Sequence, residues 1–277
     1  MLFAYLRIDF IKMKETFKLF EEKRTEFLKL RLHEAINWEK YSHMSLSHHS
    51  TAIEGSSLTE LESRLLLDEG TTPQGKPLEH SMMEKDHYGA FCFIVGEANE
   101  KRAVTPDLIM RVSAMVMKNT GGPISARGGD FDSSKGEYRK ASVFAGTRYF
   151  PSYTKVEGMV KGLCENLAGK IDNVSTTEEI HNLAFDFHYN LVSIHPFADG
   201  NGRVSRLMMN YIILYNGQNP AIIHKEDKEE YIKALEEARE KEDSVPIRKF
   251  LYNQQIKHYD LQIKSYNSRD KGISLLL

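Results

Sequence analysis

The stretch HPFADGNGRVSR, His195–Arg206, differs from the rest of the chain and constrains its structure most strongly. Pro196 disfavours helix at His195, so we expect the imidazole in an extended segment that follows a helix. The glycines of the turn at 200–202 permit a positive φ and a close backbone approach, and a helix is expected directly after them. A glycine turn that leads into a helix N-terminus presents unpaired N–H groups and the positive end of the helix dipole, which favours an anion.

Charged side chains around this turn indicate phosphoryl or nucleotidyl transfer. Arg203 and Arg206 are three residues apart, so on a helix they share a face and can bind one polyanion. Asp199 lies beside the expected anion site, where a bridging divalent cation would relieve its repulsion from phosphate, and hard oxygen ligands favour Mg²⁺. His195 supplies a base that is expected to titrate near neutral pH.

The chain on both sides of the motif predicts a mainly α-helical protein. Apolar residues recur at spacings of three, four and seven, which predicts helices over about 11–46, 57–70, 79–100, 105–119, 155–168, 176–194, 203–215, 225–241 and from about 245 onward. The start signals are Ser57 with Glu60, Thr105 with Pro106, and Thr176 with Glu179, and the end signal is Gly70. The run SVFAGTRYF, Ser142–Phe150, predicts a β-hairpin and is the one convincing β signal.

Composition limits the classes of function. The chain has 277 residues, 41% of them hydrophobic, and a formal net charge of -2, so its charge favours neither a nucleic acid nor an anionic membrane as partner. No apolar run reaches the roughly 18 residues that a membrane-spanning helix requires. Two cysteines, Cys92 and Cys164, form no disulfide framework, which predicts a reduced, cytoplasmic protein.

The motif at 195–206 resembles the signature of the Fic family, H-x-F-x-[D/E]-G-N-G-R-x-x-R, and matches it at each defined position. HYNLVSI before the motif, GEYR at 136–139 and the predicted hairpin resemble the Fic core and its flap. The resemblance implies the helical Fic (Fido) fold with a short β-hairpin flap. The implied segments are an N-terminal helical extension over 1–45, a Fic domain over 46–250 with an inhibitory helix near 46–56, and a C-terminal helical tail over 251–277.

The family's activity implies a protein adenylyltransferase, which transfers AMP from ATP to a Ser, Thr or Tyr hydroxyl of a target protein. By position, His195 would deprotonate that hydroxyl and Asp199 would hold Mg²⁺ against the phosphates. The other implied nucleotide-binding residues are Gly200, Asn201, Gly202, Arg203, Arg206 and Tyr231. The implied flap, which would hold the target segment by β-augmentation, is Val143, Phe144, Ala145 and Gly146.

The sequence STAIEG, Ser50–Gly55, resembles the family's inhibitory pattern [S/T]-x-x-x-E-[G/N]. The resemblance implies that Glu54 pairs with Arg206 and removes the partner of the γ-phosphate, so that ATP binds in a non-productive pose. Ser50 begins the pattern and is a regulatory candidate with Glu54. Ser56 follows Gly55 where the commonest family version has Asn. The same glutamate, given Mg²⁺, would position a water that removes AMP again, so transfer and removal are both open.

Three functions from different classes fit these residues. AMP transfer is favoured because every catalytic position is present. Related Doc-type proteins transfer the γ-phosphate instead and usually carry another residue at the second glycine, so Gly202 disfavours that alternative. The third alternative is a non-catalytic nucleotide-binding module that acts through partners. The resemblance also implies a homodimer as a candidate assembly, and other nucleotide donors, such as UTP or GTP, stay open.

Overall fold

The computed structural model describes residues 2–34, 38–145 and 148–270 of the chain, and these are mainly helical. They divide into two compact units, one over residues 43–220 and one over residues 1–42 together with 221–277. The helices of the second unit are α1 (Leu2–Lys29), α9 (Lys228–Glu240) and α10 (Val245–Asp270), with 3-10 turns at Leu32–Glu34 and Lys225–Asp227.

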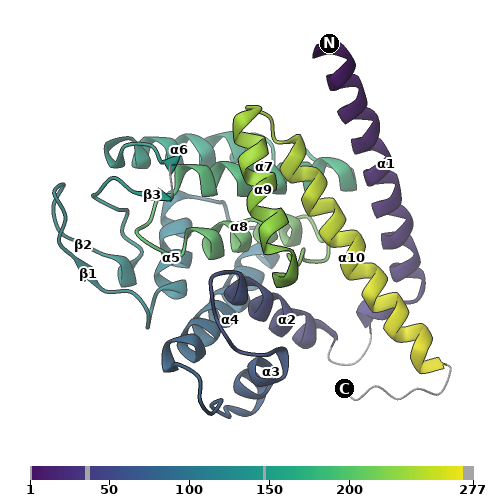
Figure 1. The fold of residues 1–277 in the computed structure, drawn as a ribbon, viewed down its shortest axis with the longest axis horizontal. Helices are drawn as coiled ribbons and strands as arrows, with labels where there is room; N and C mark the ends of the chain where they lie inside the picture. Colours follow the sequence, from purple (N-terminus) through teal and green to yellow (C-terminus); the bar gives the residue numbers. More distant parts are fainter. Residues whose placement is uncertain (1, 35–37, 146–147, 271–277) are drawn as a thin grey trace. The chain divides into compact units, whose positions relative to one another are not determined.

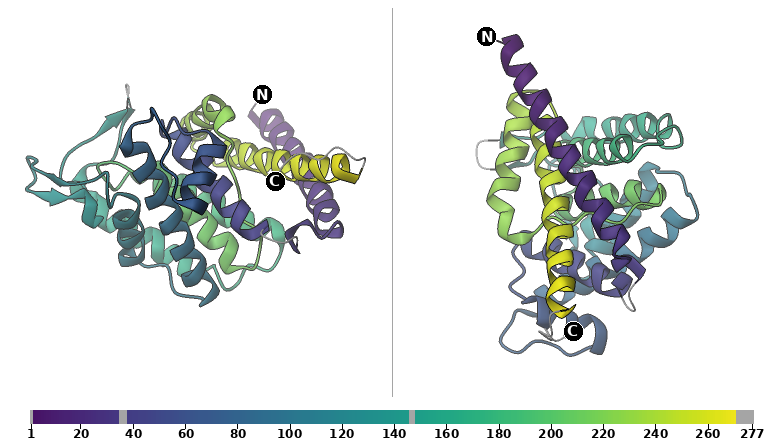
Figure 2. Two further views of the ribbon diagram at one scale, coloured as in Figure 1. Left: turned by 90° about the horizontal axis from the view of Figure 1, so that it is seen from below. Right: turned by 90° about the vertical axis from the view of Figure 1, so that its right-hand side faces the viewer.

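In the unit formed by both ends of the chain, α1 and α10 lie side by side (Figure 2). The rings of Phe17 and Phe20 contact Tyr252, and about two turns further along both helices Phe27 contacts Tyr259. The two helices therefore run in the same direction. Aromatic contacts of this kind supply a large share of the buried apolar area. Helix α9 packs against α10 in the same unit.

One predicted helix, over about 11–46, is interrupted, so the prediction of continuity was wrong. Helix α1 ends at Lys29, and α2 begins only at Trp38. Arg31 has a left-handed φ of 53°, which a continuous right-handed helix does not allow. The apolar spacing continues through this break, which is why the pattern alone did not reveal it.

The unit over 43–220 is built around one central helix. Its helices are α2 (Trp38–Ile53) from residue 43 on, α3 (Glu60–Glu69), α4 (Leu78–Asn99), α5 (Pro106–Val116), α6 (Tyr153–Ala168), α7 (Thr177–Ile194) and α8 (Asn201–Tyr215). Helix α8 packs against α4, α5 and α7 (Figure 1), and nearly all of its residues are buried. A helix that is buried all round lies in the core, so the motif residues at its start are held rigidly.

Most predicted helix ends are confirmed. Thr105 caps α5 with Pro106 in the first turn, and Thr176 with Glu179 forms a complete capping box at α7. Gly70 ends α3 with a left-handed φ of 74°.

The predicted start at Ser57 was wrong. Helix α3 is capped by Thr59, whose side chain and Glu62 form the capping box. Ser57 is instead held in the preceding loop, where its N–H donates to His80 Nδ1 at 3.1 Å and its carbonyl accepts from Lys76 at 2.7 Å. Two overlapping S/T-x-x-E patterns occur here, and these longer-range contacts select the second one.

Two small antiparallel sheets complete the described residues. Strands β3 (Phe144–Ala145) and β4 (Arg148–Tyr149) form the predicted hairpin. The predicted flap residue Gly146 lies outside the described residues. A second pair, β1 (Pro123–Ile124) with β2 (Phe131–Asp132), was not predicted, because its two-residue strands lie in a glycine-rich region without alternation.

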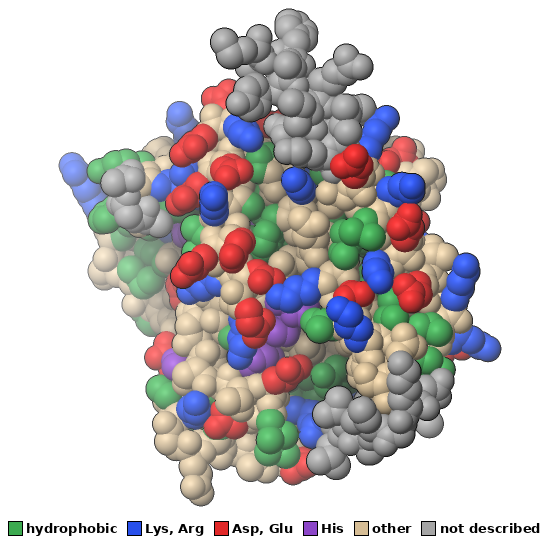
Figure 3. Space-filling view, turned by 45° about the vertical axis from the view of Figure 1, so that its right-hand side comes forward, with side chains coloured by type: hydrophobic (Ala, Val, Ile, Leu, Met, Phe, Trp, Pro, Cys, Tyr) green, Lys and Arg blue, Asp and Glu red, His purple; other side chains and the backbone are tan. Residues whose placement is uncertain are grey.

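No helix among the described residues is long and apolar enough to cross a membrane. On the face shown in Figure 3, acidic and basic side chains are interspersed rather than gathered by sign. This distribution agrees with the formal net charge of -2.

Candidate active site

The loop between α7 and α8 carries the motif in a fixed conformation. His195 ends α7 with a left-handed φ of 53°, and its N–H donates to Leu191 O at 3.1 Å. The expected extended backbone at His195 was therefore wrong. Asn201 closes the loop, since its side chain both accepts from Phe197 N and donates to Phe197 O at 2.9 Å. Phe197 is buried below the loop and anchors it.

The turn into α8 requires glycine for two reasons. Gly200 has a φ of 77°, and a Cβ at this position would lie 2.9 Å from Sδ of Met117. Gly200 is also the residue that caps α8, and no side chain among the described residues caps the helix there. The first N–H groups of α8 are therefore available to an anion, and the helix dipole favours one.

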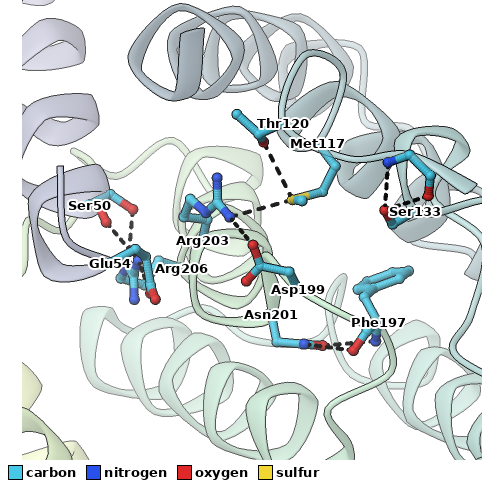
Figure 4. A network of polar contacts seen from close by, with 11 residues as sticks. Ser50, Glu54, Met117, Thr120, Ser133, Phe197, Asp199, Asn201, Arg203 and Arg206 are labelled. Atoms are coloured by element: carbon cyan, nitrogen blue, oxygen red, sulfur yellow. Dashed lines mark hydrogen bonds and ion pairs between the residues drawn. The ribbon is translucent and has the colours of Figure 1, made fainter. Parts of the chain in front are cut away.

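Arg203 is a buried cation with unused donors in this turn. Its side chain is 1% exposed, and Nη2 donates to Asp199 Oδ2 at 3.1 Å and to Sδ of Met117 at 3.4 Å (Figure 4). No described residue accepts a hydrogen bond from Nε or Nη1. Buried donors without an acceptor are costly, so the guanidinium indicates a site for an anion or for water at the start of α8.

Arg206 is held from the end of α2. Its Nε donates to Oγ of Ser50 at 2.9 Å, and its Nη2 donates to the carbonyl of Ser50 and to Oε1 of Glu54, each at 2.8 Å (Figure 4). The contact between Glu54 and Arg206 that the sequence predicts is thus present. Its regulatory meaning, and that of Ser50, stay predictions.

The carboxylate of Glu54 lies directly over the first turn of α8. A Cβ on Gly202 would be 2.2 Å from Oε1 of Glu54 and 2.9 Å from Nη1 of Arg206. Glycine at 202 is therefore what allows a carboxylate to approach this closely. Because the approach is to a helix N-terminus, Glu54 occupies the place that the dipole and the two guanidiniums make favourable for an anion.

Two buried histidines, His188 and His87, have lowered pKa values to which the charges of these guanidiniums contribute. Burial lowers the pKa of His188 to about 3, and the charge of Arg206 adds to this effect. Burial also lowers the pKa of His87 far below its usual range, and the charges of Arg206 and Arg203 act in the same direction. Both imidazoles are therefore neutral and add no positive charge to this region.

The imidazole of His195 is neutral at physiological pH. Burial lowers its pKa to about 4, and the charges of Arg148 and Arg139 lower it further, while a backbone hydrogen bond with Val192 and the charge of Glu54 oppose them. The expectation of titration near neutral pH was wrong for this state of the molecule, because the ring is enclosed. A neutral imidazole is the form that accepts a proton.

Arg139 joins the hairpin to the loop between α7 and α8, a role that the sequence did not reveal. Its Nε donates to the carbonyl of His195 at 2.7 Å, and its backbone N–H donates to Pro196 O at 3.0 Å. Its Nη1 and Nη2 donate to the carbonyls of Ala141 and Pro151, before and after the hairpin, at 2.8 and 2.6 Å. The sequence offered only GEYR at 136–139, in which Arg139 follows other polar residues and nothing indicates its partners.

Asp199 fits the role of a metal ligand by its donor chemistry. Its carboxylate is 69% exposed, beside the start of α8, and one oxygen is engaged by Arg203. The other oxygen is a hard donor next to an anion site, which is the arrangement that Mg²⁺ bridges between protein and phosphate.

The remaining predicted residues are in the hairpin and in the second compact unit. Val143 accepts a hydrogen bond from Phe150 N at 3.3 Å, Phe144 is exposed, and Ala145 is in β3. Tyr231 lies in α9 of the other compact unit, where it is buried and its ring is 5.7 Å from that of Phe250. Its predicted nucleotide contact stays a prediction.

Comparison with known proteins identifies relatives. Residues 103–213 match the family model described as Fic/DOC family. The chain is 28% identical over 239 residues to a protein adenylyltransferase Fic of Drosophila erecta, which covers 86% of this chain and 46% of the relative. It is 30% identical over 194 residues to the protein of the same name from Nematostella vectensis, and this match covers 69% of this chain and 42% of the relative. The chain thus spans less than half the length of these curated relatives.

Solved structures share the architecture. A Fic domain-containing signaling protein from Bacteroides thetaiotaomicron superimposes with a TM-score of 0.70 at 24% identity, covering 96% of this chain and all of that one. A Fic-1 fragment from C. elegans superimposes with a TM-score of 0.73 at 21% identity, covering 96% and 75%. At these identities the likeness shows the fold, and the predicted mainly helical Fic fold is confirmed.

Proposed function

Because this chain belongs to the Fic/DOC family, we propose that it is a protein adenylyltransferase that transfers AMP from ATP to a hydroxyl of a target protein. The observation that carries the proposal is the start of α8, where a glycine turn and the buried Arg203 and Arg206 directly follow a half-buried, neutral His195. An anion site beside a base suits attack at phosphorus.

His195 acts as the general base in the proposed reaction. The target hydroxyl gives its proton to the imidazole while its oxygen attacks the α-phosphorus of ATP. A new O–P bond forms, the bond between the α-phosphorus and the bridging oxygen breaks, and pyrophosphate leaves. The triphosphate that approaches the site is itself negatively charged, so its presence raises the proton affinity of His195 above that of the nucleotide-free protein.

The triphosphate is proposed to lie on the first turn of α8. Backbone N–H groups of Gly200, Asn201 and Gly202 would donate to it, and the unused donors of Arg203 and the guanidinium of Arg206 would bind its tail. Asp199 would hold Mg²⁺, which supplies charge neutralisation at the phosphates when bound.

Target recognition is proposed at the hairpin. Strand β3 is only two residues long, and Phe144 on it is exposed. A target segment could extend this small sheet by β-augmentation and so bring its hydroxyl beside the α-phosphorus.

Glu54 is proposed to be a brake on this reaction. It occupies the anion position over Gly202 and pairs with Arg206, so a γ-phosphate must displace it to reach the same guanidinium. Its side chain is 32% exposed, so the contact is accessible to competition. Ser50 keeps two hydrogen bonds to Arg206 and would preserve the orientation of the guanidinium when Glu54 is gone.

The test is transfer of label by the Glu54→Gly variant. We expect this variant to incorporate more label from α-³²P-ATP into itself than the parent does, and none from γ-³²P-ATP. Adding His195→Ala to Glu54→Gly removes the base and should lower incorporation by about 10²–10⁴-fold.

Three results would contradict the proposal. Equal labelling of Glu54→Gly and the parent would reject the brake, and labelling that survives loss of His195 would reject the base. Incorporation from the γ-position would indicate phosphate transfer of the Doc type instead.

A further inference from the structure

The hairpin next to the catalytic loop has two chemically different faces. Arg148 and Phe150 are two residues apart, which places them on the same side of an extended strand, whereas Tyr149 points to the other side. On that other side Tyr149 pairs with Phe144, and both rings are exposed. The side with Arg148 and Phe150 faces the catalytic histidine.

Phe150 lies flat against the imidazole of His195. The two ring centroids are 3.9 Å apart, and the planes are tilted by only 25°. The guanidinium of Arg148 lies 4.2 Å from the centroid of Phe150. Phe150 thus contacts both a cation and the imidazole, and a ring held by two neighbours has few other orientations.

Both partners of this stack are attached to one rigid frame. Arg139 is buried and donates to the carbonyls of His195 and Pro151, so it joins the residue that carries the imidazole to the residue that follows Phe150. Phe150 N also donates to Val143 O, which fixes Phe150 to the opposite strand of the hairpin. Because backbone and rings are both held, the stack is a defined geometry rather than a chance contact.

We propose that Phe150 is a positioning residue for His195: its ring fixes the plane of the imidazole and excludes water from one face of it. The proposal rests on the proposed function for its consequence, because the imidazole plane decides whether its nitrogen points at the attacking hydroxyl. A misplacement of about 1 Å can lower a rate by about 10²-fold.

The effect on protonation follows from the same contacts. The charged groups facing the imidazole are Arg148 and Arg139 from the hairpin side and Glu54 from the end of α2, with the backbone of Val192 on α7. Removing the ring of Phe150 admits water to His195 and relieves the burial that holds its pKa low. The pKa of His195 should then move up toward 6.5, its ordinary value.

Two substitutions separate stacking from packing. Phe150→Leu keeps an apolar side chain but removes the aromatic face, whereas Phe150→Tyr keeps the face. In the Glu54→Gly background we expect Phe150→Leu to lower kcat for AMP transfer by about 10- to 100-fold with the KM for ATP unchanged. Phe150→Tyr should keep kcat near that of Glu54→Gly alone. The proposal would be overturned if Phe150→Leu transferred AMP as fast as Glu54→Gly alone, or if both substitutions lowered kcat equally.

The pKa of His195 can be measured without an activity assay, so the proposal can be tested even if the chain transfers no AMP. An NMR titration of the full chain, with the His195 signal assigned by its loss in His195→Gln, should show a higher pKa in Phe150→Leu than in the parent. Tyr149→Leu, which removes the ring next in sequence but on the other face, should leave this titration unchanged. If Phe150→Leu does not fold, upfield-shifted His195 ring protons with Phe150 NOEs in the unaltered chain support the stack, and their absence overturns it.

Discussion

Glu84 is a buried carboxylate whose replacement by glutamine gives a quantitative prediction. It lies in α4 with a 0% exposed side chain and accepts hydrogen bonds from two hydroxyls, Oγ1 of Thr51 at 2.5 Å and Oγ of Ser63. Thr51 is in α2 and Ser63 in α3, so one carboxylate joins three helices. Burial raises the pKa of Glu84 to about 7, and the two hydroxyls only partly oppose this effect.

The magnitude follows from linkage between protonation and folding. The folded-state pKa of about 7 exceeds the ordinary value of 4.5, so between these values the folded chain holds a proton that the unfolded chain has lost. The free energy of unfolding is therefore highest below about pH 4.5 and falls as the pH rises through about 7. From pH 5 to pH 8 this loss is about 2 to 3 kcal/mol.

Glu84→Gln has nearly the same shape but no charge to lose, so it should lack this pH dependence. The assay is urea unfolding of the parent and Glu84→Gln, followed by circular dichroism in steps between pH 5 and pH 8. The quantity of interest is the difference between the two free energies of unfolding, because the other titrating groups cancel in it. The parent should lose about 2 to 3 kcal/mol relative to Glu84→Gln across this range. Parallel curves would refute the reasoning.

Three further substitutions test the anchoring of α2 and the approach of the triphosphate to α8. Thr51→Val and Ser63→Ala each delete one hydroxyl donor to Glu84 and should each cost about 1–3 kcal/mol of unfolding free energy, but only Thr51→Val loosens α2 and should raise labelling from α-³²P-ATP. Equal labelling of the two would contradict this. In the Glu54→Gly background, Gly202→Ala still places a Cβ 2.9 Å from Nη1 of Arg206 and beside the first N–H groups of α8, so it should weaken Mg·ATP binding by about tenfold or more in calorimetry. An unchanged affinity for Mg·ATP would contradict a close approach of the triphosphate to the backbone at residue 202.

Local signals predicted much of the fold. The capping box of Thr176 with Glu179 and the left-handed cap at Gly70 depend on residues within five positions, so the sequence displays them directly. The hairpin at 144–149 was visible for the same reason. The motif at 195–206 likewise assembles its glycine turn and two arginines within twelve residues of chain.

Residues whose role comes from distant partners were not predictable in this way. Arg139 acts through carbonyls of residues 195 and 196, and Glu84 through hydroxyls on two other helices. Neither contact leaves a period or a motif in the sequence. The pKa of His195 was misjudged for a related reason: its burial depends on Phe150 and the hairpin, which only the folded chain brings together.

The most direct test of the account is calorimetric titration of Mg·ATP into the parent and into Glu54→Gly. If the start of α8 is a phosphate site for which Glu54 competes, Glu54→Gly should bind one Mg·ATP per chain at least about tenfold more tightly than the parent. Arg203→Gln in the same background should abolish this gain. Absence of binding heat in Glu54→Gly, under conditions where the variant is folded, would contradict the central claim.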